Sequence, residues 1–187
     1  MKKINYISLN LFNILIALAY SIIFVYFIPW TELKGTEFTD VINYTDRMIY
    51  LINGGREREF HGISILFSEV LWKYLIIYLA TIFKDPYTGI YLISVTSLFI
   101  YTFLVLKKTN NYFLLILLFN PIFIQLIMDQ VRIAFAFALF LLGYELLVNN
   151  KLKILAFTII IITPLIHTAM LIIIAVFCYI YFFNNYF

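Results

Sequence analysis

The chain has 187 residues, of which 64% are hydrophobic and 12% charged, with a mean hydropathy of +0.98. A soluble domain of this length cannot bury so much apolar surface, so the composition predicts an all-α, polytopic integral membrane protein. The net charge of +3 is small, and no basic patch interleaves with aromatic residues, which excludes a nucleic-acid binder. The single cysteine, Cys178, lies in an apolar run and excludes an intrachain disulfide.

The first element predicted in chain order is a transmembrane helix over residues 8–29, which carry no charge. Lys2 and Lys3 precede it and predict a cytoplasmic N-terminus by the positive-inside rule. A cleaved signal peptide is the competing interpretation, because the Ala-Leu-Ala sequence at 17–19 resembles a cleavage site. The apolar sequence continues past this site to Pro29, which favours the helix.

Residues 30–62 form the one long polar segment and are predicted to be an outer loop. Within this loop, an amphipathic helix is predicted over residues 40–53, ending before two glycines. Its apolar side chains recur at spacings of three and four: Val41, Tyr44, Met48 and Leu51. A helix with one apolar face beside a membrane is expected to lie in the interface.

Further apolar runs cover residues 90–106, 112–128, 133–148 and 154–183. The last is too long for one simple span at a rise of about 1.5 Å per residue. Thr163 and Pro164 interrupt it, which predicts a broken helix or a re-entrant turn near His167.

Residues 63–83 have two possible placements. A full crossing would put Lys107 and Lys108 outside, against the positive-inside rule, and Glu69 and Lys73 near the bilayer centre. We therefore expect this segment to lie at the outer interface or to re-enter. The cytoplasmic lysines are then Lys2, Lys3, Lys107, Lys108, Lys151 and Lys153. The residues on the outer side are Asp40, Glu69, Arg132 and His167.

Arg132 lies between two charge-free runs, at the start of a helix with alanines at 134, 136 and 138. A guanidinium at the bilayer centre costs roughly 2.5–3.5 kcal/mol, so Arg132 is expected at a helix end. One interpretation is that it snorkels to headgroups while the small residues let another helix approach. The other is an anion site for phosphate or diphosphate, helped by free backbone N–H groups and the helix dipole. Asp129 and Gln130 are candidate caps of this helix.

Three other residues have both structural and chemical interpretations. Asp40 is either an N-cap or a general base at the membrane surface. Glu69 is spaced for an i, i+4 ion pair with Lys73, which we favour, or is an acid or base with a raised pKa. His167 is by default a hydrogen-bonded packing residue, with binding or proton transfer as the alternative. No metal-binding or nucleotide-binding motif occurs, so no cofactor and no metal are expected.

The order of these motifs resembles the EpsG/Wzy-type family of bacterial polysaccharide polymerases. A first span is followed by Asp40-Val-Ile-Asn-Tyr44, by Glu69-Val-Leu-Trp-Lys-Tyr74 and by a Lys-Lys turn. The junction Asp129-Gln-Val-Arg132-Ile-Ala134 and the stretch Ile166-His167-Thr168-Ala169 complete the likeness, which spans roughly residues 40–171. In that family the junction resembles Gly-Ile-Arg-Gln-x-x-Ala, whereas here Gln130 precedes the arginine and the glycine is missing.

The resemblance implies transfer of a growing glycan from undecaprenyl diphosphate to the next lipid-linked repeat unit. The reaction would occur at the outer face of the bacterial plasma membrane, for O-antigen, capsule or exopolysaccharide. It needs a cation for the diphosphate leaving group (Arg132 or Arg47) and a carboxylate near the acceptor (Asp40 or Glu69), and His167 is a further catalytic candidate. The partners implied are the undecaprenyl-diphosphate-linked glycan, membrane lipid and a chain-length regulator or flippase.

Other functions remain open on the sequence. Family members are typically about twice as long, so we expect this chain to be the N-terminal part of a longer polymerase or a frameshifted product, either of which could be inactive alone. A lipid-linked oligosaccharide flippase or transporter subunit would instead need a polar path through the bilayer, for which Glu69, Lys73 and Glu145 are the candidates. A small membrane scaffold, in which Arg132 only snorkels, is the third.

Overall fold

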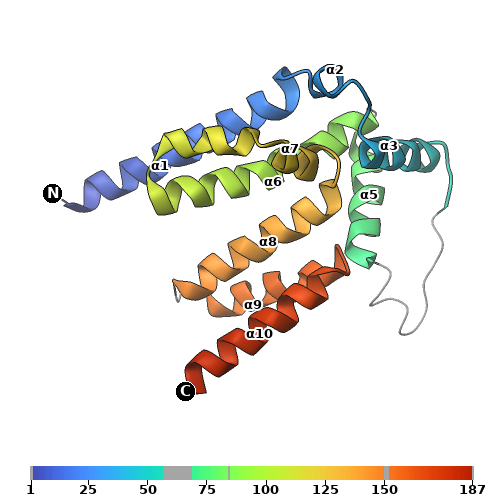
Figure 1. Ribbon diagram of the computed structural model, residues 1–187. Helices are drawn as coiled ribbons and strands as arrows, with labels where there is room; N and C mark the ends of the chain where they lie inside the picture. The colour runs from blue at the N-terminus through green and yellow to red at the C-terminus, as the bar shows by residue number, and fades with distance from the viewer. Residues whose placement is uncertain (1, 57–68, 84, 150–151, 187) are drawn as a thin grey trace.

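The computed structural model describes residues 2–56, 69–83, 85–149 and 152–186 (Figure 1). All regular secondary structure in these ranges is helical, which confirms the all-α fold. Within them, α6 (Pro86–Thr109) and α8 (Val131–Val148) are long and apolar enough to cross a membrane. Residues 57–68 lie outside the described part of the chain; they include the end of the predicted outer loop and the start of the segment 63–83. Lys151, one of the predicted cytoplasmic lysines, also lies outside it.

The core of the bundle is built around α6, which packs against α1 (Lys2–Ile22) on one side and α8 on the other. Its start is well defined, because the Asp85 carboxylate accepts hydrogen bonds from the backbone N–H groups of Tyr87 and Thr88. Pro86 occupies the first turn, where a missing N–H is tolerated. Helix α8 then packs against α9 (Lys153–Ile162), so α6 and α8 are the inner elements.

Small residues allow α8 to fit between its neighbours. Ala134, Ala136 and Ala138 are fully buried, as expected if small side chains let helices approach closely. A Cβ added at Gly143 would lie 3.1 Å from the carbonyl oxygen of Ala156 in α9. The two helix backbones therefore approach at a distance that glycine permits.

The predicted first span ends in an irregular turn. Helix α1 continues into a π-helical turn, η1 (Ile23–Phe27), followed by extended backbone at Ile28. A short helix, α2 (Trp30–Lys34), then begins after Pro29 and ends at Gly35, whose φ of 74° is the left-handed conformation that glycine adopts readily.

The apolar run 112–128 is not one helix, which corrects the continuous run read from the sequence. It divides into a 3-10 helix, η2 (Tyr112–Phe119), and α7 (Pro121–Met128). Asn120 between them has extended backbone, and its side chain accepts a hydrogen bond from Ile122 N–H at 2.9 Å. The proline disfavours helical backbone at the residue before it, so a new helix starts there.

The run 154–183 is broken where predicted. Helix α9 ends at Ile162, η3 (Thr163–Leu165) contains the proline, and α10 (Met170–Tyr186) follows after a turn. His167 lies in that turn, at the break predicted near it.

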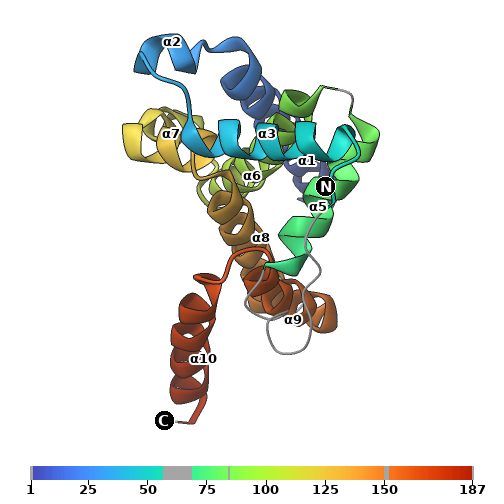
Figure 2. The ribbon, with the colours of Figure 1, turned by 90° about the vertical axis from the view of Figure 1, so that its right-hand side faces the viewer.

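Two helices lie across one end of the bundle. Helix α3 (Thr39–Ile52) matches the predicted amphipathic helix, with Val41, Tyr44 and Met48 buried. It packs against α5 (Val70–Ile82), the described part of the segment predicted over 63–83. Figures 1 and 2 show α5 running transverse to α1 and α6. An interfacial or re-entrant segment would have this orientation, although its placement in a membrane stays a prediction.

Candidate functional site

Arg132 is the second residue of α8 and points to a carboxylate. Its Nη1 donates to Oε2 of Glu69, and 31% of its side chain is exposed. Gln130 holds the N-cap position of α8, as one of the two expected caps, but its side chain makes no capping hydrogen bond. The first N–H groups of α8 are thus left without a side-chain acceptor at the cap.

Glu69 joins three segments of the chain. Its Oε2 binds Arg132, and its Oε1 lies 2.7 Å from Nδ1 of His167 and accepts the backbone N–H of Thr168 at 3.1 Å. The i, i+4 spacing to Lys73 is helical, because the backbone N–H of Lys73 donates to the carbonyl oxygen of Glu69 at 3.1 Å, and the side-chain pair expected between them stays a prediction. Glu69 is the N-cap residue of α5 and has left-handed backbone (φ 53°, ψ 48°). Its side chain reaches across the bundle to Arg132 and His167.

The geometry at His167 suits a proton acceptor. When Nδ1 carries the proton and donates it to Glu69, the second nitrogen, Nε2, is left with a lone pair. The carboxylate thus selects the tautomer and orients the ring, as in other histidine–carboxylate pairs. The side chain is 19% exposed, so it is partly accessible.

Asp40 lies in the first turn of α3, beside this network. Phe38 occupies the N-cap position, so the N-cap interpretation of Asp40 is wrong. The backbone N–H of Asp40 donates to Oδ1 of Asp129 at 3.1 Å. Burial raises the pKa of Asp40, against the opposing charge of Arg132; Asp129 raises it further and His167 lowers it. Asp40 is therefore close enough to Arg132 and His167 for their charges to affect its pKa.

Tyr44 was missed as a site residue, because its spacing assigned it only to the apolar face of α3. Burial raises its pKa to about 12, with Arg132 and Arg47 opposing this and Asp40 and Glu69 adding to it. Its ring makes an edge-to-face contact with Trp72, with 5.0 Å between centroids. The i, i+4 spacing from Asp40 was the available signal, since it places both residues on one face of the helix.

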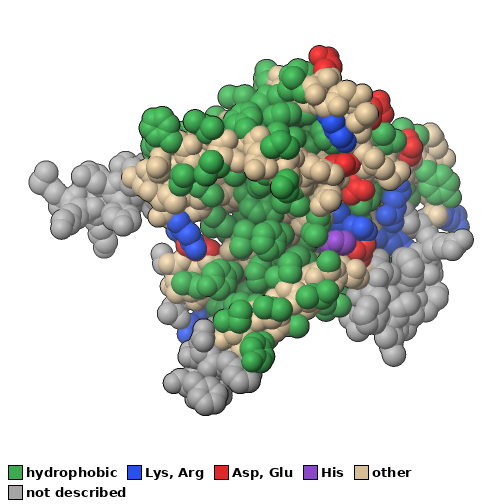
Figure 3. Space-filling view, viewed as in Figure 1, with side chains coloured by type: hydrophobic (Ala, Val, Ile, Leu, Met, Phe, Trp, Pro, Cys, Tyr) green, Lys and Arg blue, Asp and Glu red, His purple; other side chains and the backbone are tan. Residues whose placement is uncertain are grey.

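The structure therefore brings Asp40, Glu69, Arg132 and His167 together, with Arg47 next to Tyr44 at the edge. We call Asp40, Tyr44, Glu69, Arg132 and His167 the polar cluster. In Figure 3, charged side chains gather at the end of the molecule where α3, α5 and the start of α8 meet. The described residues contain no group of three or more metal-ligating side chains. The cluster combines a cation, an oriented imidazole and a carboxyl group with a raised pKa.

A second charged group lies at the opposite end of α8. Glu145 is buried, and its carboxylate accepts from Lys107 Nζ at 2.9 Å, Lys108 Nζ at 3.0 Å and Asn149 Nδ2 at 2.8 Å. Its carboxylate ties the end of α6 to the end of α8.

Comparison with known proteins returned no match: no family model, no curated protein and no solved structure is similar to this chain.

Proposed function

We propose that the chain takes part in polymerising undecaprenyl-diphosphate-linked oligosaccharide repeat units at the outer face of the bacterial plasma membrane. The observation that carries the proposal is the contact of Glu69 with both Arg132 and His167, beside Asp40. This network lies at one end of a bundle that has two helices suited to a membrane. The motif order that resembles the EpsG/Wzy-type family supports the same function.

The reaction requires one bond to form and one to break. The acceptor hydroxyl oxygen attacks the anomeric carbon of the donor glycan, and the bond from that carbon to the diphosphate oxygen breaks. The hydroxyl proton passes to a base, and the electron pair leaves with the diphosphate. Because no electrons are exchanged with a redox partner, a positioned base and a fixed cation suffice.

The contacts distribute these roles among the residues. The carboxylate of Glu69 already binds Arg132 and His167, so we assign it to positioning and assign the proton acceptor to Asp40. A guanidinium has five N–H donors in a fork, so Arg132 can keep its bond to Glu69 and still bind phosphate oxygens. His167 remains the second candidate base, through Nε2.

The distribution of charge favours a polymerase over a transporter. The polar cluster, which includes Glu69, lies at one end of α8, and Glu145, another of the three candidates for a polar path, is bound by two lysines at the other end. A scaffold in which Arg132 only snorkels is disfavoured as well, because a carboxylate from a distant segment holds the guanidinium.

The proposal is tested by complementation of a strain that lacks this gene and makes a surface polysaccharide ladder. We expect the wild-type chain to restore the ladder and Arg132→Ala to leave single repeat units, a loss of at least about a hundredfold in polymer, the size typical of losing one preorganised donor. Arg132→Lys should restore little, because lysine cannot bind bidentately. Arg56→Ala is the matched control, since this arginine is exposed and lies after α3.

Immunoblots of membranes establish that all variants accumulate equally. A full ladder from Arg132→Ala at equal abundance would remove Arg132 from the mechanism. Failure of the wild-type chain to restore any polymer would contradict polymerase activity of this chain by itself.

A further inference from the structure

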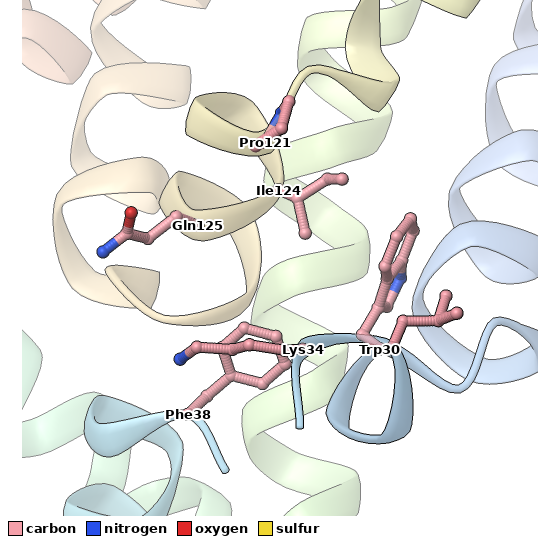
Figure 4. Close-up of a pocket in the computed structure, with 7 residues that line it drawn as sticks. Trp30, Lys34, Phe38, Pro121, Ile124 and Gln125 are labelled. Carbon is pink, nitrogen blue, oxygen red and sulfur yellow. The ribbon is translucent and has the colours of Figure 1, made fainter. Parts of the chain in front are cut away.

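A pocket of about 340 Å³ lies between α2 and α7 (Figure 4). Its wall is mostly apolar, formed by Trp30, Phe38, Pro121 and Ile124, and two polar side chains, Lys34 and Gln125, reach its edge. Trp30 is held in place, since its Nε1 donates to the carbonyl oxygen of Phe24 at 2.6 Å. The pocket thus has an aromatic wall fixed to the backbone of the first span.

Lys34 is the charged group of this pocket. Its ammonium lies 4.4 Å from the centroid of the Phe38 ring and 3.7 Å from Oδ2 of Asp129. The ammonium also donates to the carbonyl oxygen of Glu37 at 3.3 Å, and 36% of the Lys34 side chain is exposed, so a further anion can approach the ammonium. Its aliphatic stem meanwhile adds to the apolar wall.

Asp129 connects the pocket to the polar cluster. Its Oδ2 faces Lys34, and its Oδ1 accepts the backbone N–H of Asp40. One carboxylate therefore separates the cation at the pocket from the proposed base. A ligand whose apolar part fills the pocket would place an attached anionic group at Lys34, on the side of the cluster.

We propose that this pocket binds the polyprenyl chain of the lipid diphosphate donor, with Lys34 binding its diphosphate. The inference rests on the proposed function and adds the subsite for the lipid. The occupant must be apolar and anionic, which the lining and Lys34 require together. A volume of about 340 Å³ suits only a short apolar segment, so the pocket holds the isoprene units next to the diphosphate and the rest of the chain remains in the membrane.

The two tryptophans of the chain make binding measurable by fluorescence, since Trp30 lines the pocket and Trp72 is buried elsewhere. Trp72→Phe leaves Trp30 as the single reporter and removes an indole N–H that has no hydrogen-bond partner among the described residues. The purified chain in detergent is titrated with farnesyl diphosphate, farnesol, inorganic diphosphate and phosphatidylglycerol. Farnesyl diphosphate should quench Trp30 saturably. Farnesol and inorganic diphosphate should bind at least about tenfold more weakly, because farnesol lacks the anionic group and inorganic diphosphate lacks the apolar part. Phosphatidylglycerol has both features but carries a single phosphodiester charge and two acyl chains, so it should also bind at least about tenfold more weakly.

Lys34→Gln separates the two contributions to binding. It should weaken farnesyl diphosphate about tenfold, the effect of losing one charge-assisted bond, and leave farnesol binding unchanged. Lys153→Gln is the control, because Lys153 is an exposed lysine on α9. Equal quenching by phosphatidylglycerol would show a general lipid site, and unchanged affinity in Lys34→Gln would remove Lys34 from the diphosphate site; either result overturns the proposal.

Two combinations of results separate lipid binding in the pocket from polymerase activity. Saturable, Lys34-dependent binding of farnesyl diphosphate by a chain that restores no polymer would keep the pocket and reject the polymerase. Polymer restored equally by wild type and Lys34→Gln, without quenching of Trp30, would keep the polymerase and reject the pocket.

Discussion

At the scale of single residues, Glu69 organises the polar cluster. It has left-handed backbone, an uncommon conformation for a residue with a side chain, which persists only when its surroundings hold it. Contacts with Arg132, His167 and Thr168 supply that restraint. This backbone conformation, rather than helical periodicity, directs the carboxylate across the bundle.

Asp40 provides a test based on pH. Because burial raises its pKa in the folded chain above the ordinary value of 3.8, the folded state binds this proton more tightly than the unfolded state. Asp40 therefore adds stability below pH 3.8, and this stability is lost as pH rises through the raised pKa. We expect Asp40→Asn to be at least as stable as wild type at neutral pH, with the difference disappearing on acidification below pH 3.8, measured by thermal unfolding in detergent.

The same variant should lose polymer formation, because asparagine cannot accept the hydroxyl proton. Glu37→Gln is the control for removing an exposed acidic charge near α3. A wild-type ladder from Asp40→Asn would transfer the role of base to His167, and lower stability than wild type at neutral pH would contradict the direction of the pKa shift.

At the scale of elements, interruptions determine where the site forms. Both helix breaks, at Asn120-Pro121 and at Thr163-Pro164, can be predicted from the sequence, because proline restricts the backbone of the residue before it. Of these, the second was predicted and the first was not. Strong, uninterrupted hydrophobicity over 112–128 concealed the first break, since hydropathy does not report backbone conformation.

Gly143 tests the close contact between α8 and α9. A Cβ there would approach Ile160 Cγ1 to 2.8 Å and the Ala156 carbonyl oxygen to 3.1 Å. Gly143→Leu should therefore force the helices apart and lower stability by about 1–3 kcal/mol, typical of overpacking. Thermal unfolding in detergent measures the change. Val148→Leu, at the exposed end of α8, should leave the melting temperature unchanged, and an unchanged value for Gly143→Leu would mean that the helices are not in close contact.

At the scale of the whole molecule, charge is separated between two ends of the bundle. The polar cluster lies at one end, and Lys107, Lys108 and Glu145 lie at the other. Lys153 begins α9 at the same end as the two lysines in Figure 1. The apolar helices α1, α6 and α8 lie between them, as expected if the bundle spans a membrane.

This separation predicts the sidedness of the chain. In a Cys178→Ser background, Asp46→Cys on α3 should react with a membrane-impermeant maleimide in intact cells. Lys153→Cys should react only after permeabilisation, because lysines are expected on the cytoplasmic side. Both positions are exposed, so accessibility is matched. Labelling of Lys153→Cys in intact cells would reject the outer placement of the cluster.

The sequence by itself determined the helical class, the apolar core segments and the identity of the residues that carry charge. Composition and periodicity suffice for these features, since they depend on local burial and spacing. Only the tertiary structure decided which charges meet. Arg132 lies 63 residues and His167 lies 98 residues after Glu69 along the chain. Their contacts follow from how α5, α8 and the turn before α10 pack. The contacts of Glu69 with Arg132 and His167 were not predicted, because sequence spacing indicates pairs only between near neighbours in one helix. A partly buried charge is instead stabilised by whichever opposite charge the fold brings close to it.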